Sequence, residues 1–573
     1  MSEIKDLEIE ELSIYEKLSI ERKLGQENKD IPKWMITGGY QILKQKYLNP
    51  GETVKQMYKR IACAAAKHTP KKEVWSERFF NMMWRGWLSP ASPILANMGT
   101  DKGCTVSCSG QYVGDAIWNF YDSQLESAML SKNGFGTSCY LGDIRERGAG
   151  VSGGGTASGI VPVFNDFVQL SRDVSQGNTR RGAWAGYLDI DHPDFFELIE
   201  ELMAQPDDKN IGWNVTDDFI ERLQSGDEDA IIRYQRAMKA KCITGKGYFF
   251  FVDKTNRANP ECYAQNDLSV KASNLCTEIT LHSDASHSFT CVLSSMNLAK
   301  WDEWKDTDAV FWATVFLDCV AQEFIEKGSK IRGLEKAVRF TEKGRALGLG
   351  VMGFHTYIQS QNWVFGDLMS HMWNNEVFKH LDKESMRATK WMAEAYGEPE
   401  WCKGFGIHNT HRLAVAPTTS TALICGGVSQ GIEPIVENVF NQASAAGEIE
   451  RINPQLLDIM IERGKYTKAV KRDIIDHEGS VQHVDWLSDE EKQVFRTAFE
   501  IDQRNLLRFA SQRQLYIDQA QSLNLFFAAD EDEAYISEIH KEAFLDENIK
   551  SLYYMRSRAG VQAAKDECVA CEG

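Results

Sequence analysis

The residues with the clearest chemical potential lie at positions 274–278, which read Asn-Leu-Cys-Thr-Glu. The Cys276 thiol is two residues from the Asn274 amide and two residues from the Glu278 carboxylate. If the stretch is extended, the two-residue period of a strand places all three side chains on one face. A sulfur, an amide and a base would then converge on one small volume. Because a single buried Cys is more often a small hydrophobe, this hypothesis depends on what distant segments contribute.

Other cysteines could supply reducing equivalents. Cys108 and Cys291 each lie in a polar stretch that is typical of a loop, and a dithiol reductant needs two sulfurs that can approach to about 2.05 Å. Cys568 and Cys571 form a Cys-x-x-Cys pair near the C-terminus, which can form a disulfide and exchange it with another. Alternatively, this pair could bind zinc together with Cys104 and Cys108, although the spacing of the latter two matches a zinc knuckle imperfectly.

Two adjacent phenols, Tyr553 and Tyr554, stand near the C-terminus. Adjacent tyrosines commonly contribute to packing or to an interface. They could instead form a stacked pair that passes a radical, because a phenol can lose a proton and an electron together over hydrogen-bond distances.

A hydroxyl-rich turn follows Pro417 and contains Thr418, Thr419, Ser420 and Thr421. If this turn opens a helix, its backbone N–H groups and the helix dipole could bind a phosphate without any lysine. The alternative is an ordinary helix N-cap made by one of the hydroxyls.

The elements that must position these groups are predicted by periodicity to form an α/β fold, because short strands alternate with helices through the middle of the chain. A buried strand is expected at 247–252. Residues 90–93, Pro-Ala-Ser-Pro, are expected to end a Trp-rich helix and to start a loop. Helices are expected at 53–67, at 194–204, at about 310–328 and 376–396, and in a segment that ends near Lys132.

Bulk properties restrict the class of protein. With 573 residues, the chain exceeds the size of one hydrophobic core. The net charge of −18 argues against general binding to nucleic acids or acidic membranes. The sequence has no signal peptide at its start and no stretch of about 18 apolar residues. We therefore expect a cytoplasmic protein whose thirteen cysteines act as thiols rather than as structural disulfides.

Taken together, the motifs resemble those of the catalytic large subunit of class I ribonucleotide reductase, in family order from about residue 89 onward. Residues 274–278 resemble the finger-loop motif, and Cys108 and Cys291 resemble the reductive pair. Residues 417–421, continued by Gly-Ile-Glu-Pro at 431–434, resemble the turn that binds the substrate diphosphate. The resemblance implies a ten-stranded α/β barrel around a central finger loop at 89–556, a mainly helical region at 1–88 and a flexible tail at 557–573.

The resemblance also implies roles for individual residues. Cys276 would become a thiyl radical that abstracts the ribose 3′ hydrogen, Glu278 would be the general base, and Asn274 would hold a ribose hydroxyl. Cys108 and Cys291 would reduce the substrate. Tyr553 and Tyr554 would relay the radical, and Cys568 and Cys571 would re-reduce the pair before a thioredoxin- or glutaredoxin-type protein reduces them in turn. The implied substrate site contains Ser92, Ser107, Asn274, Glu278, Thr418, Thr419, Ser420 and Thr421.

The family further implies ribonucleoside diphosphate substrates and a homodimer with an allosteric site for a nucleoside triphosphate effector. Asp115 and Arg145 match effector contacts, and Lys132 is a further candidate. The loop at 174–182, with Gln176 and Arg181, matches the segment that communicates with the substrate. No metal ligands are expected on this chain and no cofactor is expected to be attached to it, because a separate radical-generating subunit would supply the radical.

Two alternatives remain. An adenosylcobalamin-dependent (class II) reductase would share the finger-loop cysteine, the reductive pair and the tail thiols. The tyrosine pair favours class I, because only an imported radical needs that path. A non-catalytic paralogue that binds nucleotides would be free to lose the reactive residues, yet all of them are present.

Many family members begin with an ATP-binding cone domain, whose Gly- and Lys-rich pattern is missing from residues 1–88. We therefore expect that rising dATP does not shut off turnover through such a site. Turnover assays across a dATP titration check this expectation, and steep inhibition with dATP bound near the N-terminus would contradict it.

Overall fold

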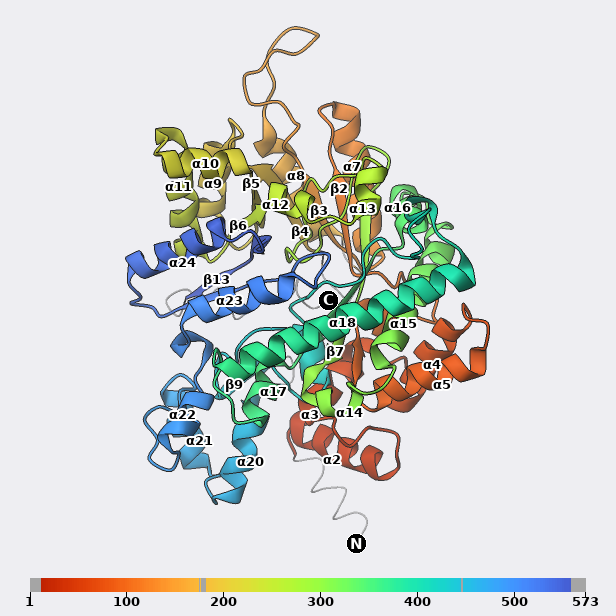
Figure 1. The fold of residues 1–573 in the computed structure, drawn as a ribbon, viewed down its shortest axis with the longest axis vertical. Helices are drawn as coiled ribbons and strands as arrows, with labels where there is room; N and C mark the ends of the chain where they lie inside the picture. The colour runs from red at the N-terminus through yellow and green to blue at the C-terminus, as the bar shows by residue number, and fades with distance from the viewer. Residues whose placement is uncertain (1–11, 175, 177–181, 445–446, 558–573) are drawn as a thin grey trace.

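A curled central sheet is surrounded by helices in the computed structural model, which describes residues 12–174, 176, 182–444 and 447–557 (Figure 1). Arg181, Cys568 and Cys571 lie outside the described residues. Nine strands form the main sheet. They are β1 (Leu88–Pro90), β2 (Cys108–Tyr112), β3 (Gly136–Tyr140), β4 (Trp184–Asp189), β5 (Ile211–Val215), β6 (Tyr248–Phe251), β7 (Phe289–Asn297), β8 (Leu347–Met352) and β12 (Ser551–Leu552).

The neighbouring strands and bridges of this sheet follow one another around a closed path. Strands β2 to β6 are parallel, β7 is antiparallel to β2, and β8 is parallel to β7. Single parallel bridges continue from Leu349 to Leu413 and from Val415 to Gln521. The Tyr553 amide then donates to the Leu523 carbonyl at 2.9 Å, and β12 pairs with β6. This path confirms a barrel-like α/β fold, while the number of ten strands stays a prediction.

The strands are buried on both faces because helices cover the outside and the finger loop occupies the inside. Strand β6 reads Tyr-Phe-Phe-Phe and is completely buried, as its apolar run predicts. One core cluster lies under the helices α7 (Ile117–Lys132), α8 (Ile160–Asp173), α9 (Phe195–Ala204), α10 (Asp217–Ser225) and α11 (Glu228–Thr244), and the short helix α12 (Val252–Arg257) follows β6.

A second layer of long helices crosses the other half of the sheet (Figure 1). Helix α15 packs between the sheet and α18, so nearly all of its side chains are buried. The helices of this half are α13 (Glu261–Gln265), α14 (Trp301–Trp304), α15 (Ala309–Gly328), α16 (Glu335–Gly344), α17 (Phe354–Ser360), α18 (Leu368–Tyr396), α19 (Thr419–Ile424) and α23 (Gln503–Gln514), whereas α24 (Glu533–Leu545) packs in the first core cluster. The helices predicted at 53–67, 194–204, 310–328 and 376–396 are confirmed.

Smaller elements complete the fold. The N-terminal helices are α2 (Ile14–Glu27), α3 (Thr37–Ile42), a π-helix (Leu43–Tyr47), α4 (Val54–Ala66), α5 (Lys72–Trp84) and α6 (Ser92–Asn97). A satellite unit consists of β9 (Val439–Ser444), β10 (Gly447–Ile452), α20 (Pro454–Glu462), α21 (Lys468–Asp476) and α22 (Asp489–Val494), and β11 (Leu525–Phe527) pairs with β13 (Met555–Ser557). Among the described residues, no helix is long and apolar enough to cross a membrane.

The prediction of a loop after residues 90–93 is wrong. Pro90 ends β1, which pairs with β7, and Ser92 begins helix α6 with Pro93 in its first turn. Proline is tolerated there because the first N–H groups of a helix have no intrahelical acceptor. The two prolines therefore mark a direct passage from strand to helix.

Helix α3 rests against α19 through Gly39. A Cβ atom added at this glycine would lie 2.7 Å from the Leu423 carbonyl oxygen and 2.9 Å from the Ile424 Cα. We expect Gly39→Ala to lower the free energy of unfolding by about 1–3 kcal/mol, although alanine normally favours a helix. Urea denaturation measures the change. Gly153→Ala, where the new methyl group meets nothing within 4 Å, is the control, and equal stabilities of the two variants would contradict the expectation.

Candidate active site

The finger loop at 274–278 is a tight turn rather than an extended strand. The prediction that the two-residue period of a strand places Asn274, Cys276 and Glu278 on one face is therefore wrong. Thr277 has a φ of +68°, and its amide donates to the Asn274 carbonyl at 3.3 Å. The Asn274 Oδ1 accepts from the Ile279 amide at 3.2 Å, which closes the turn from the side-chain side. The turn, and not the strand period, determines where Cys276 lies relative to its neighbours.

Surrounding strands hold this turn by its carbonyl groups. The Tyr187 hydroxyl donates to the Asn274 carbonyl at 2.6 Å, and the Ser551 hydroxyl donates to the Thr277 carbonyl at 3.1 Å. The Ala520 amide donates to the Glu278 carbonyl at 3.0 Å. Three separate segments of the barrel thus fix the loop that carries Cys276.

Cys108 and Cys291 lie directly opposite each other on antiparallel strands β2 and β7. Both were predicted in loops, and that prediction is wrong because small polar side chains fill strands that are buried on both faces. Opposed residues in such a pair have Cα atoms about 4.5–5.5 Å apart, which falls in the range that a disulfide requires. Both side chains are buried, and their opposed positions allow a disulfide to form between them.

Neighbouring amides orient these sulfurs. The Asn274 Nδ2 lies 3.5 Å from the Cys108 Sγ, and the Gln519 Nε2 lies 3.4 Å from the Cys291 Sγ. Asn274 therefore touches the reductive pair while its backbone forms the finger loop. The structure brings Asn274, Cys108 and Cys291 together as predicted.

Glu278 is buried with its carboxyl group inside the barrel. Burial raises the pKa of this carboxyl to about 7, against a smaller opposing contribution from hydrogen bonds to the backbone and to Asn274. Its Oε2 atom has no hydrogen-bond partner among the described residues. A carboxyl group whose pKa is near neutral and whose oxygen is available is suited to proton transfer.

A chain of phenols leads to Cys276. The Tyr553 hydroxyl lies 3.7 Å from the Cys276 Sγ, and the rings of Tyr553 and Tyr554 are 4.0 Å apart between centroids. Tyr553 is completely buried, whereas Tyr554 is half-buried. Two rings, tilted by 46° to each other, thus connect the half-buried Tyr554 to the Cys276 thiol.

Thr418 begins the hydroxyl-rich turn in a left-handed conformation, with a φ of +59°. Its Oγ1 accepts from the Gly431 amide at 2.7 Å and does not cap helix α19. The helix therefore starts without a side-chain cap, which favours the anion-site interpretation over the N-cap alternative. Thr419 donates to the Gln430 side chain at 3.3 Å, which folds the following segment back over the turn.

Glu433 connects this turn to the tyrosine pair. The Asn524 Nδ2 donates to a Glu433 carboxylate oxygen at 2.5 Å, while the Asn524 Oδ1 accepts from the Tyr554 amide at 3.0 Å. Ser92 is buried against the Tyr47 hydroxyl at 2.8 Å, and Ser107 is buried immediately before β2. Both candidate substrate residues, Ser92 and Ser107, are thus buried.

The candidate effector residues occupy a different region, around α7. Asp115 and Arg145 form an ion pair at 2.7 Å, and Lys132 is exposed in the last turn of α7. Gln176 donates to the Asn97 Oδ1 at 3.2 Å. Asn97 is the last residue of helix α6, and the candidate substrate residue Ser92 is its first. The short helix α6 therefore connects the Gln176 contact to Ser92.

Sequence reasoning missed three residues that contact the site, namely Tyr187, Tyr248 and Gln519. The Tyr248 ring lies 4.7 Å from that of Tyr553, and its hydroxyl lies 3.4 Å from the Tyr554 hydroxyl. A lone hydroxyl in the otherwise apolar strand β6 was the available signal. Gln519 lies in an unremarkable polar stretch and offered none.

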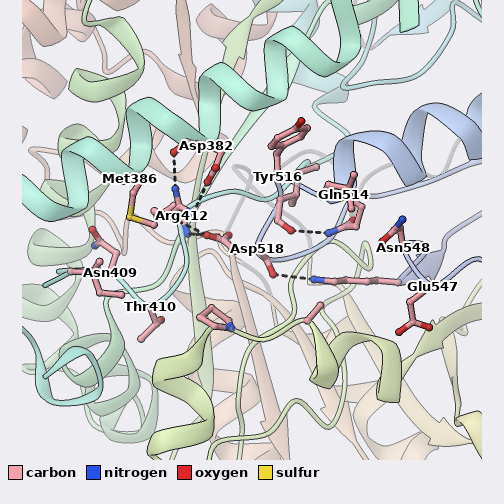
Figure 2. Close-up of a pocket in the computed structure, with 16 residues that line it drawn as sticks. Asp382, Met386, Asn409, Thr410, Arg412, Gln514, Tyr516, Asp518, Glu547 and Asn548 are labelled. Carbon is pink, nitrogen blue, oxygen red and sulfur yellow. Dashed lines mark hydrogen bonds and ion pairs between the residues drawn. The ribbon is translucent and has the colours of Figure 1, made fainter. Parts of the chain in front are cut away.

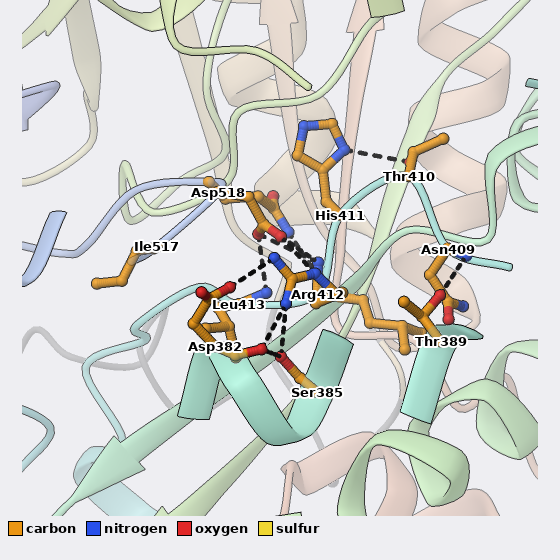
Figure 3. A network of polar contacts seen from close by, with 12 residues as sticks. Asp382, Ser385, Thr389, Asn409, Thr410, His411, Arg412, Leu413, Ile517 and Asp518 are labelled. Atoms are coloured by element: carbon orange, nitrogen blue, oxygen red, sulfur yellow. Dashed lines mark hydrogen bonds and ion pairs between the residues drawn. The ribbon is translucent and has the colours of Figure 1, made fainter. Parts of the chain in front are cut away.

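A network of polar contacts around Asp518, the residue before Gln519, includes Arg412 and Asp382 (Figure 3). The Asp518 carboxylate accepts from the backbone amides of Arg412 and Leu413, each at 2.9 Å, and the Arg412 guanidinium pairs with Asp382 at 2.8 Å. The Lys550 ammonium donates to the Gln519 carbonyl at 2.7 Å. These bonds fix the segment that presents the Gln519 amide to Cys291.

A cavity of about 430 Å³ opens on the same outer side and is lined by Arg412, Tyr516, Asp518 and Lys550, among others (Figure 2). None of the predicted catalytic or substrate residues lines it. The buried Gln519 separates it from Cys291. This cavity is therefore distinct from the candidate active site.

The pKa of Glu278 gives a pH dependence of stability. Between pH 4.5 and 7 the native carboxyl keeps a proton that the unfolded chain releases, so stability falls as pH rises through this window. Relative to Glu278→Gln, the unaltered chain should lose about 2–3 kcal/mol between pH 5 and pH 8. Urea unfolding at both values measures this. Glu77→Gln, which alters an exposed carboxyl, should lose as much stability as the unaltered chain. An equal loss in Glu278→Gln would contradict the expectation.

Comparison with known proteins agrees with this geometry. The family model for the ribonucleotide reductase barrel domain matches residues 106–234, 230–404 and 399–555, and the model for the ribonucleotide reductase all-alpha domain matches residues 37–103. A solved structure, the Actinobacillus ureae class Id ribonucleotide reductase alpha subunit, is 36% identical with a TM-score of 0.86. The match covers 93% of this chain and 99% of the Actinobacillus ureae chain.

Viral proteins are similar over comparable lengths. A Frog virus 3 protein, described as a candidate ribonucleoside-diphosphate reductase large subunit, is 32% identical over 89% of this chain and 94% of its own length. The ribonucleoside-diphosphate reductase large subunit of Invertebrate iridescent virus 3 is 28% identical over 93% and 98%. The barrel-domain match covers most of the chain and includes the finger loop, the reductive pair and the tyrosine pair. The chain belongs to the ribonucleotide reductase large-subunit family.

Proposed function

We propose that this chain is the catalytic subunit of a class I ribonucleoside-diphosphate reductase, which converts ribonucleotides to 2′-deoxyribonucleotides for DNA synthesis. The observation that carries the proposal is the approach of Tyr553 to Cys276, on the loop whose Asn274 side chain contacts Cys108 of the opposed pair Cys108 and Cys291. A radical entry route, a hydrogen-abstracting thiol and a two-electron reductant serve one reaction only when they lie together.

The first half of the reaction generates a substrate radical. A Tyr553 phenoxyl radical takes the hydrogen atom of the Cys276 thiol, and the resulting thiyl radical takes the 3′ hydrogen of the ribose. Glu278 accepts the proton of the 3′-hydroxyl, for which a carboxyl pKa of about 7 is suitable. Asn274 holds a ribose hydroxyl through its side-chain amide, which already lies at the reductive pair.

The second half replaces the 2′-hydroxyl by hydrogen. A thiol of the Cys108 and Cys291 pair protonates the leaving 2′-hydroxyl, which departs as water. The pair supplies two electrons and becomes a disulfide, C2′ gains a hydrogen, Glu278 returns the proton to the 3′ oxygen, and Cys276 returns the 3′ hydrogen. Enclosure by the barrel protects the radical intermediates, because open access of water or oxygen would quench them.

The substrate diphosphate binds at the uncapped start of α19, in this proposal, with its oxygens facing the amides and hydroxyls of residues 418–421. The ribose then lies toward Ser92, Ser107 and Glu278. Helix starts favour anions because their N–H groups and dipole point at the ligand. Thr418, Thr419, Ser420 and Thr421 fill this role without a lysine.

Two partner proteins follow from the same chemistry. A small subunit generates the radical and passes it to Tyr554, whose partial exposure suits a hand-over between proteins. The tail thiols Cys568 and Cys571 reduce the internal disulfide by exchange, and a thioredoxin- or glutaredoxin-type protein reduces the tail. Such thiol chemistry needs a reducing compartment, so we infer a cytoplasmic location.

A homodimer is supported by the outer face of α7. Ile117, Trp118, Tyr121 and Leu125 are 73%, 80%, 62% and 53% exposed. Four large apolar side chains on one helix suit burial against a second subunit. A nucleoside triphosphate effector would bind beside this face, where Asp115 and Arg145 precede and follow α7, with Lys132, Gln176 and Arg181 as further contacts.

The test combines two substitutions in the full chain, reconstituted with candidate radical-generating subunits. We expect Cys276→Ser to abolish deoxynucleotide formation while nucleotide binding persists, because serine cannot form the required sulfur radical. Tyr554→Phe should also abolish turnover, because its ring cannot relay the radical. Retained turnover of Cys276→Ser would refute the radical role.

Matched controls alter the same residue types at exposed positions. Cys63→Ser and Tyr466→Phe lie on the surface and should retain turnover. Adenosylcobalamin without any partner subunit provides the second comparison. Turnover under that condition, insensitive to Tyr554→Phe, would instead indicate the cobalamin-dependent class.

A further inference from the structure

The segment between Glu278 and Cys291 contains a cluster of metal-ligating side chains with no role in the proposed reaction. His282, Asp284 and His287 offer two imidazole nitrogens and a carboxylate oxygen that lie within 4.8 Å of one another. His282 is buried, while the other two are half-buried. We propose that this cluster is a binding site for a divalent transition-metal ion, zinc being the ion that its ligands suit best.

The ligand atoms already stand at coordination distances from one another. The Asp284 Oδ2 lies 3.0 Å from the His282 Nε2 and 3.2 Å from the His287 Nδ1. In a tetrahedral zinc site with bonds of about 2.0–2.1 Å, neighbouring ligand atoms are about 3.3 Å apart. A cation therefore fits with little movement of these three atoms.

A tight turn presets the carboxylate. The backbone groups of Asp284 and His287 bond to each other in both directions, at 3.0 and 3.3 Å. The Asp284 Oδ1 accepts from the amides of Ser286 and His287 at 2.7 and 2.8 Å. The Oδ2 atom accepts no backbone bond, so it is the oxygen that is available to a metal.

The backbone of Ser269 orients the outer nitrogen of His282. The His282 Nδ1 lies 2.9 Å from the Ser269 carbonyl oxygen and 3.2 Å from the Ser269 amide nitrogen, while its Nε2 lies 3.0 Å from the Asp284 Oδ2. With a metal ion bound at Nε2, the Nδ1–H group donates to the Ser269 carbonyl, which is the usual orienting contact of a metal-bound histidine.

His287 presents its Nδ1 to the same carboxylate, at 3.0 Å from Oδ1 and 3.2 Å from Oδ2. The Trp401 ring packs 5.2 Å from His287 and limits its rotation.

Surrounding charge permits a cation. Lys343 stacks on the same Trp401 ring but pairs with Glu400 at 2.9 Å, so its charge is compensated. The Asp284 side chain is 41% exposed, which leaves an approach for the ion and a coordination position for water. Two imidazoles, one carboxylate and water form a ligand set typical of zinc.

The position of this site defines its effect. The metal would bind His282 and His287, near the two ends of the segment that joins the finger loop to strand β7. It would fix this segment without contacting the substrate. The sequence analysis expected no metal ligands on this chain. The inference does not depend on the proposed reaction, because binding can be measured in the absence of turnover.

The test is titration of the metal-free full chain with zinc chloride by calorimetry. We expect one site whose affinity falls at least tenfold in His287→Gln and in Asp284→Asn. The control is His483→Gln in the exposed cluster of Asp473, His477 and His483, which should leave this site unchanged. Equal affinity in all chains would overturn the proposal.

Cobalt substitution separates this site from the cysteines. With cobalt(II) in place of zinc, we expect visible bands without an intense thiolate-to-cobalt charge-transfer band, and we expect His287→Gln to remove them. An intense charge-transfer band that disappears in Cys568→Ser would overturn the proposal by placing the metal on the tail. A rise in melting temperature with zinc should appear in the unaltered chain and vanish in Asp284→Asn, even if that variant is less stable.

Discussion

The left-handed backbone at Thr277 is the constraint on which the site depends. A β-branched residue in this conformation costs of the order of 1–3 kcal/mol and persists only where surrounding contacts determine it. Here the hydroxyls of Tyr187 and Ser551 and the amide of Ala520 bind the carbonyls on either side of it. This turn directs the Cys276 thiol toward Tyr553 and the Asn274 side chain toward Cys108 on β2. Relaxation of the turn would break one of these two contacts.

Burial serves two purposes in this interior. It raises the pKa of Glu278 to about 7, and it raises the pKa of the Cys291 thiol well above its ordinary value, so that the sulfur keeps its proton. A protonated thiol is what the departure of a hydroxyl as water requires, whereas an exposed thiolate would favour unwanted disulfide exchange. Desolvation is thus the largest contribution to the raised pKa of both groups.

The fold class and the identity of the reactive residues were predictable because they depend on local pattern. The buried run of β6 and the periodic helices α4 and α15 follow from hydropathy alone. The turn at Thr277 was not predictable, since its conformation is fixed by residues 187, 520 and 551, which are distant in sequence. Cys108 looked like a loop residue because a strand covered on both faces needs no alternation and tolerates small polar side chains. Gln519 contacts Cys291 only through tertiary packing.

The order of the chain has a consequence for its synthesis. Tyr553 is joined to the barrel by the Leu523 carbonyl and by the buried Lys241, whose ammonium donates to the Tyr553 carbonyl at 2.5 Å. The residues it meets, at positions 241 and 276, emerge from the ribosome some three hundred residues earlier. Because contacts so distant in sequence require closure of a long loop, Tyr553 reaches Cys276 only when the end of the chain docks. In the proposed reaction, a chain that stops short of Tyr553 has no route by which the radical could reach its thiols.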